Sequence, residues 1–318
     1  MDKKLENLMI NIGRSARDSS YGLAKKSNDN RNKAIFFIAE SIENNIKMLL
    51  EANAKDIETA NNKNLSPSLI DRLMLNEERI LSMASSMRVI TEIPDPINQV
   101  MEEWSRPNGL IIKRLSVPLG VIGIIYESRP NVTSDAAALC IKSGNAVILR
   151  GGSESFESNK AIHFCLKEGI KKAKLDESIA QLVPTRDRDA VGFMLSSMNN
   201  YIDVVVPRGG KNLVRRVQDE ARIPVIGHLE GICHIYVHHS ADFNITKKII
   251  LNAKMRRTGI CGAAETILID KKIAPQIVSK LADELERAGC EIRGDNEAQK
   301  YSKYIDEATN DDWSTEYL

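Results

Sequence analysis

A cysteine in a turn of small residues is the feature of this sequence best suited to chemistry. Cys261 lies between Gly259 and Gly262, after a helix-like segment and before an apolar, strand-like run. Such a turn can expose the sulfur and leave backbone N–H groups free beside it. A thiolate that attacks an acyl carbon needs this setting, because the oxyanion that forms must meet donors already in place. Cys261 is therefore a candidate nucleophile, although a buried structural cysteine fits the same residues.

Three polar turns also follow predicted strands and precede predicted helices. The first holds Asn131, the second Arg150 and Ser153, and the third Gly209 and Gly210. Ligands of open parallel sheets bind at the carboxyl ends of strands, and free N–H groups at a helix start can hold an anion. An ordinary turn is the simpler explanation of the first turn, and helix capping by Ser153 explains the second equally well. Neither a GxGxxG fingerprint nor a P-loop occurs, so the usual dinucleotide signal is absent.

The elements that must position these turns change in character along the chain. Residues 1–92 predict helices, because apolar residues from Ile35 to Leu49 recur at spacings of three and four. Prolines interrupt the pattern at 93–108, and residues 109–117 predict an extended strand.

The remainder alternates strands with helices, which predicts βαβ units and a parallel sheet. A first series has strands at 119–126, 146–149, 180–183, 203–206 and 224–226, with helices at 133–142, 154–172, 190–198 and 211–219. A second series has strands at 233–237, 266–269 and 290–292, with helices at 246–256 and 273–288. We expect a domain boundary near residues 227–231.

Composition excludes several classes of function. The 318 residues are 42% hydrophobic and 27% charged with a net charge of +1, which gives no electrostatic reason to bind nucleic acid or a membrane. The start resembles no signal peptide, and the longest apolar run is too short to span a bilayer. The five cysteines are odd in number and form no CxxC pair, and the histidines show no HExxH spacing. We therefore expect a cytoplasmic protein without a metal site.

Taken together, the stretches 117–133, 143–152 and 254–265 resemble the aldehyde dehydrogenase superfamily, and within it the γ-glutamyl phosphate reductases. The resemblance extends over essentially the whole chain. It implies an aldehyde-dehydrogenase-like α/β fold, with a doubly wound cofactor domain at 1–229 that carries an oligomerisation flap near 100–118. An αβ catalytic domain would occupy 230–318. About a further quarter of the family chain would follow, so the C-terminal part is expected to be missing.

The resemblance also implies roles for the residues singled out above. Cys261 matches the catalytic cysteine, and Asn131 matches the asparagine whose amide shares the oxyanion hole. Arg150 stands where a basic residue touches the adenosine ribose. Ser153 replaces a glutamate of NAD-preferring members, which leaves room for a 2′-phosphate and implies NADP(H). The turn at 209–210, formed by Gly209 and Gly210, matches the turn near the pyrophosphate.

The implied reaction is the NADPH-dependent reduction of L-glutamyl 5-phosphate to L-glutamate 5-semialdehyde and phosphate in L-proline biosynthesis, through a cysteine thioester. The full-length chain would form a homo-oligomer and could associate with glutamate 5-kinase. Hydrolysing members carry a water-activating glutamate where this chain has His228, with Glu230 two residues away, which favours reduction. Two alternatives stay open: a dehydrogenase that oxidises a free aldehyde, and a truncated, non-catalytic binding module.

Overall fold

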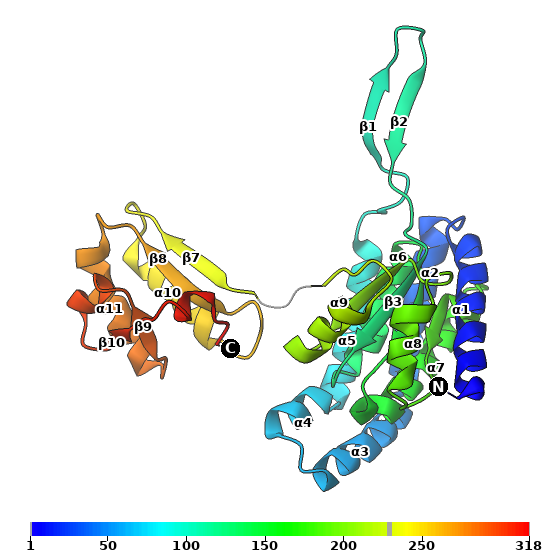
Figure 1. Cartoon of the computed structure of the whole chain (residues 1–318), viewed down its shortest axis with the longest axis horizontal. Coiled ribbons are helices and arrows are strands. Elements are labelled where there is room, and N and C mark those ends of the chain that lie inside the picture. The colour runs from blue at the N-terminus through cyan, green and yellow to red at the C-terminus, as the bar shows by residue number, and fades with distance from the viewer. Residues whose placement is uncertain (1, 228–230, 318) are drawn as a thin grey trace. The chain divides into compact units, whose positions relative to one another are not determined.

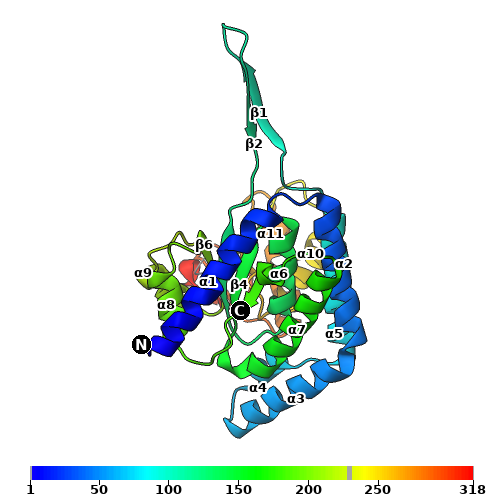
Figure 2. The same cartoon turned by 90° about the vertical axis from the view of Figure 1, so that its right-hand side faces the viewer.

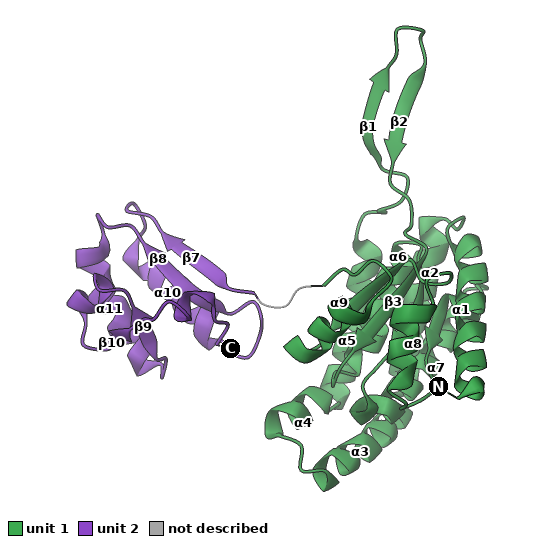
Figure 3. Cartoon of the chain, in the orientation of Figure 1, with its two compact units in different colours: residues 1–227 green, residues 228–318 purple. Residues whose placement is uncertain are grey.

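A computed structural model describes residues 2–227 and 231–317 of the chain. The chain divides into two compact units, residues 1–227 and 228–318 (Figure 3), and the division lies two residues before the boundary expected after residue 229. Each unit has its own apolar core, and the two are described in turn.

Unit 1 is built on a four-stranded parallel sheet with the strand order β5-β4-β3-β6. Its strands are β3 (Val121–Tyr126), β4 (Ala146–Arg150), β5 (Ala180–Leu182) and β6 (Val204–Arg208). Every residue of β3 and β4 is buried, as the apolar runs of these segments require when helices cover both faces of a sheet. The chain moves outward from β3 through β4 to β5, then returns to place β6 on the other side of β3. This reversal makes the gap between β3 and β6 the switch point of the sheet.

Helices cover both faces of the sheet, so the predicted doubly wound architecture is confirmed (Figures 1 and 2). Ile122 and Ile124 of β3 pack into one core, while Val121 and Ile125 pack into the other. The first core includes residues of α2 (Asn28–Asn44), α3 (Ile46–Asn62), α5 (Glu77–Glu92), α6 (Asn131–Lys142) and α7 (Phe156–Lys172). The second includes residues of α1 (Lys3–Leu23), α8 (Asp189–Ser197) and α9 (Lys211–Glu220). The short elements of this unit are α4 (Pro67–Leu73), η1 (Ser153–Ser155) and η2 (Glu177–Ile179).

An antiparallel hairpin projects from unit 1 (Figures 1 and 2). Strand β1 (Val100–Ser105) pairs with β2 (Ile111–Leu115), and only Ile112 among their residues is not exposed. The sequence predicted the second of these strands but missed the first. The prolines on either side of β1 and its lack of a buried face removed the usual signals of a strand.

Unit 2 contains two small parallel pairs of strands. Strand β7 (Cys233–Val237) pairs with β8 (Ala264–Ile269), and β9 (Ile292–Gly294) pairs with β10 (Ile305–Glu307). Helices α10 (Phe243–Met255) and α11 (Ala274–Arg287) contribute the apolar residues that pack on the first pair. Short helices η3 (Ala298–Tyr301) and η4 (Asp312–Ser314) complete the unit. In both units, none of the described helices combines the length and the apolar character that crossing a membrane would require.

Candidate active site

The three polar turns predicted in unit 1 emerge at one edge of the sheet. In the strand register, Ile125 of β3 lies opposite Arg150 of β4, and Tyr126 lies opposite Arg208 of β6. Because the strands are parallel, the segments that follow them leave from the same end. Two of these turns flank the switch point between β3 and β6, where ligands of open α/β sheets bind.

Asn131 begins α6 and is half-buried at this edge. Its side-chain Nδ2 donates a hydrogen bond to Asp135 Oδ2 at 2.9 Å, one helical turn away. Burial raises the pKa of the Asp135 carboxyl, and the Asn131 hydrogen bond acts in the opposite direction. A primary amide has two N–H donors, so Asp135 can orient the Asn131 amide while the second N–H stays available for an oxyanion. Asp135 was missed in the sequence, because the helix was predicted to begin at residue 133 and therefore did not include Asn131.

Arg150 is 5% exposed and lies against backbone carbonyls. Its guanidinium donates to the carbonyl oxygen of Gly151, and to those of Arg186 and Asp187 at 3.3 and 3.2 Å. Burial lowers the pKa of Arg150, and its Nε is buried without a partner. To pair with a phosphate, the guanidinium would have to exchange some of these carbonyl contacts. Ser153, by contrast, is exposed at the start of η1.

A carboxylate lies beside Ser153, and sequence reasoning overlooked it. Glu154 Oε1 accepts hydrogen bonds from the backbone N–H and the hydroxyl of Ser128, at 2.7 and 2.9 Å. It thereby ties the turn after β3 to the turn after β4. A Cβ placed on Gly152 would fall on this carboxylate, so a larger residue there would require the Glu154 side chain to move.

A second overlooked carboxylate lies at the N-terminus of α9. Gly210 caps this helix, and its backbone N–H donates to Glu127 Oε2 at 2.8 Å. A Cβ added at Gly209 would lie 2.5 Å from the same oxygen. Gly209 and Gly210 are both exposed, and the N–H at this helix end already holds an anionic oxygen. The N–H of Gly210 can therefore donate to an anionic oxygen.

Cys261 of unit 2 lies in a turn between α10 and β8. The turn is closed by a hydrogen bond from the Ala263 N–H to the Ile260 carbonyl at 2.9 Å. On the neighbouring strand, Cys233 Sγ donates to the Cys261 carbonyl oxygen at 3.4 Å. The structure describes all five cysteines, and only Cys261 among them is exposed. The residue is thus exposed to solvent, a setting in which a thiol can react.

An ion pair joins the two ends of this turn. Lys254 Nζ lies 3.0 Å from Glu265 Oε2, and their side chains are only 16% and 3% exposed. The pair links the last turn of α10 to the start of β8. It therefore restricts the loop that carries Cys261, a role that sequence reasoning did not assign.

Asn131 belongs to unit 1 and Cys261 to unit 2. The structure describes the surroundings of each residue within its own unit. His228 and Glu230, the positions compared with the water-activating glutamate, lie outside the described residues.

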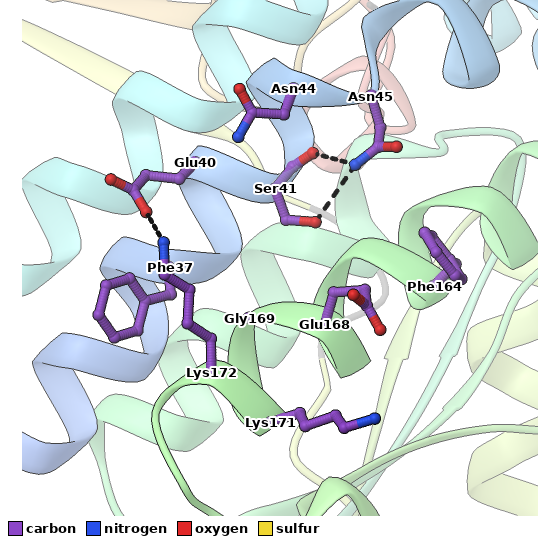
Figure 4. A pocket seen from close by; sticks show the side chains of 10 residues that line it. All are labelled: Phe37, Glu40, Ser41, Asn44, Asn45, Phe164, Glu168, Gly169, Lys171 and Lys172. Carbon is purple, nitrogen blue, oxygen red and sulfur yellow. Dashed lines mark hydrogen bonds and ion pairs between the residues drawn. The ribbon is translucent and has the colours of Figure 1, made fainter.

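A pocket of about 470 Å³ lies elsewhere in unit 1, between α2 and α7 (Figure 4). Glu40 and Lys172 form a 2.7 Å ion pair on its wall, and the ammonium of Lys172 lies 4.4 Å from the ring centroid of Phe37. None of the residues predicted from the sequence lines this pocket. The pocket is therefore separate from the candidate residues of unit 1.

Alkylation should distinguish Cys261 from the other cysteines. Burial raises the pKa of the Cys140 thiol to about 12 and that of Cys165 to about 11. Because the thiolate is the reactive form, iodoacetamide near neutral pH should modify Cys261 first and these two only after unfolding. Peptide mass spectrometry over a time course gives the order. Equal rates at Cys261 and Cys140 would contradict the described burial.

Comparison with known proteins agrees with the fold and the motifs. The sequence profile of the aldehyde dehydrogenase family matches residues 12–310. The chain is 54% identical over 314 residues to γ-glutamyl phosphate reductase of Paramagnetospirillum magneticum, covering 99% of this chain and 74% of that protein. It is 51% identical over 315 residues to the enzyme of the same name from Rhodopseudomonas palustris, covering 99% and 73%.

A solved structure is similar as well. The crystal structure of γ-glutamyl phosphate reductase from Thermotoga maritima matches with a TM-score of 0.90 and 39% identity, over 97% of this chain and 74% of that one. The chain thus spans about three quarters of these relatives' length. These matches confirm the resemblance inferred from the three sequence stretches. The chain belongs to the aldehyde dehydrogenase family and, within it, to the γ-glutamyl phosphate reductases.

Proposed function

We propose that this protein catalyses the NADPH-dependent reduction of L-glutamyl 5-phosphate to L-glutamate 5-semialdehyde and phosphate, a step of proline biosynthesis. The name shared by the relatives supports the reaction. The observation that carries the chemistry is the exposed sulfur of Cys261 in a turn held by Cys233 and by the Lys254–Glu265 pair.

In this reaction the Cys261 thiolate attacks the acyl carbon of the substrate. A C–S bond forms, the C–O bond to phosphate breaks, and phosphate leaves with the electron pair of that bond. The Asn131 amide and the backbone N–H of Cys261 stabilise the oxyanion. Hydride addition to the carbonyl carbon of the resulting thioester, followed by C–S cleavage with the electron pair returning to sulfur, releases the aldehyde and restores the thiolate.

The edge of the sheet in unit 1 suits a nicotinamide dinucleotide, which supplies the hydride when bound. Its pyrophosphate would take the place of the Glu127 carboxylate on the Gly210 N–H, at the N-terminus of α9. Arg150 and Ser153 would lie at the adenosine ribose.

We favour NADPH over NADH because Ser153 brings no charge against a 2′-phosphate and Arg150 offers a cation. The nearby Glu154 carboxylate is engaged by Ser128. A marked preference for NADP⁺ over NAD⁺ in the assay described below is therefore expected. Equal use of both would argue against this reading of Ser153.

We also propose that the β1–β2 hairpin joins this chain to a second copy. A two-stranded hairpin is at best marginally stable alone, and its unpaired edges and exposed apolar side chains favour association. Met101, Trp104 and Ile111 are 68%, 39% and 58% exposed. A homo-oligomer would bury them.

The reverse reaction tests the function. Glutamate 5-semialdehyde is incubated with NADP⁺, with and without inorganic phosphate, and NADPH is followed by absorbance. Oxidation that requires phosphate is the expected result. Oxidation without phosphate would instead identify a dehydrogenase of free aldehydes, and absence of turnover would favour a binding module.

A further inference from the structure

Two histidines and a carboxylate lie close together just beyond the C-terminal ends of β7 and β8. His238 and His239 directly follow β7, and Asp270 directly follows β8. Because the two strands are parallel and adjacent, both segments leave from the same end, and the Asp270 N–H donates to the Val237 carbonyl at 3.0 Å. One potential ligand atom from each of the three side chains lies within 4.8 Å of the other two.

This cluster is separate from the proposed nucleophile. Cys261 precedes β8, whereas Asp270 follows it, so the six residues of this extended strand separate the turn from the cluster. At about 3.3 Å per residue, Ala264 at the start of β8 and Asp270 beyond its end lie roughly 20 Å apart. The reaction proposed for Cys261 therefore makes no use of these three residues.

Two of the three ligand atoms lie at a separation that fits a metal site, while Nδ1 of His238 is within 2.8 Å of the Ser240 hydroxyl, so His238 would bind through Nε2 or after leaving that contact. His239 Nδ1 and Asp270 Oδ2 are 3.1 Å apart, and ligands at about 2.0–2.1 Å from a tetrahedral metal are roughly 3.3 Å from each other. The ring centroids of His238 and His239 are 3.8 Å apart. The side chains of His239 and Asp270 are 45% and 19% exposed. The rings can therefore adjust, and water can supply a remaining ligand.

We propose that His238, His239 and Asp270 form a surface site for a divalent transition metal such as Zn²⁺, Co²⁺ or Ni²⁺. Imidazole nitrogens select these ions, whereas Ca²⁺ and Mg²⁺ require mainly oxygen ligands. The site opens to solvent, and Lys272 places a positive charge near Asp270. It should therefore bind more weakly than a closed structural zinc site. No sequence motif predicted this metal site, because the residues that follow β7 and β8 come together only in the folded chain.

Such a site would join the ends of β7 and β8 and stabilise unit 2, because an ion that binds only the folded state raises stability by mass action. The test uses Co²⁺ with the chain carrying Cys261→Ser, so that the exposed thiol does not compete. Calorimetric titration gives stoichiometry and affinity. Visible absorption reports the coordination, and thermal unfolding reports the stabilisation.

We expect one equivalent of Co²⁺ to bind and to raise the unfolding temperature. His239→Gln should weaken binding by at least about tenfold and remove the metal-dependent rise in unfolding temperature, while leaving unfolding without metal nearly unchanged. His238→Gln should act in the same direction. His234→Gln is the matched control, because His234 is an exposed histidine of β7 outside the cluster. Absence of binding, or equal weakening by His234→Gln and His239→Gln, would overturn the proposal.

Discussion

Replacement of Cys261 by alanine should abolish reduction of L-glutamyl 5-phosphate. The acyl group then has no sulfur to bind, and loss of a covalent nucleophile lowers kcat by more than about 10⁴-fold in comparable cases. Because Cys261 is exposed in a turn, the free energy of unfolding should change by no more than about 0.5 kcal/mol. Initial rates and a thermal unfolding curve for the same preparation check both expectations.

Cys290→Ala is the control for this variant. Cys290 is a half-buried cysteine of the same unit, and it is not part of the proposed site. We expect this control to retain most of the activity. If Cys261→Ala kept a tenth of the parent rate, or if both variants lost activity equally, the covalent mechanism would be wrong.

Replacement of Asn131 by alanine should lower kcat by about a hundredfold or more, because one oxyanion donor contributes roughly 2.7–4 kcal/mol to transition-state stabilisation. The KM should change much less, since the oxyanion exists only after attack. Steady-state kinetics separate the two quantities. A mild loss of kcat, or a loss expressed only in KM, would remove Asn131 from the oxyanion hole.

Asp135 provides the companion variants. Asp135→Ala releases the Asn131 amide and should lower kcat, whereas Asp135→Asn keeps an acceptor for the 2.9 Å hydrogen bond and should restore most of it. A purely structural role would affect stability in both variants without this difference in kcat.

The Asn131 variant should also change the pH dependence of stability. Burial raises the folded-state pKa of Asp135, and the Asn131 hydrogen bond lowers it. Loss of that bond raises the pKa further, so burying the ionised carboxylate costs more at pH values above the folded-state pKa. As the pH falls through the folded-state pKa, the carboxyl is protonated in the folded chain and this added cost is lost. The variant's deficit in unfolding free energy should therefore shrink as the pH is lowered through that range, and a deficit independent of pH would exclude this coupling.

Much of the architecture could be predicted from the sequence. The helices and strands from β3 to α9 were predicted because buried parallel strands appear as runs of apolar residues, and the helices that cover them show apolar residues at helical spacing. The turn with Cys261 and the turns after β3, β4 and β6 were predicted on the same local basis. The order of elements from β7 to β9 also agrees with the sequence.

What only the tertiary structure decided is which distant groups meet. The β5-β4-β3-β6 order created the switch point. It brought Glu127 to Gly210, 83 residues away, and Glu154 to Ser128, 26 residues away. The sequence by itself determined the segments, because helix and strand preferences are set by neighbouring residues. Which residues of different segments come into contact depended on the fold. A hydrogen bond or an ion pair forms wherever packing brings its two groups together, whatever their separation along the chain.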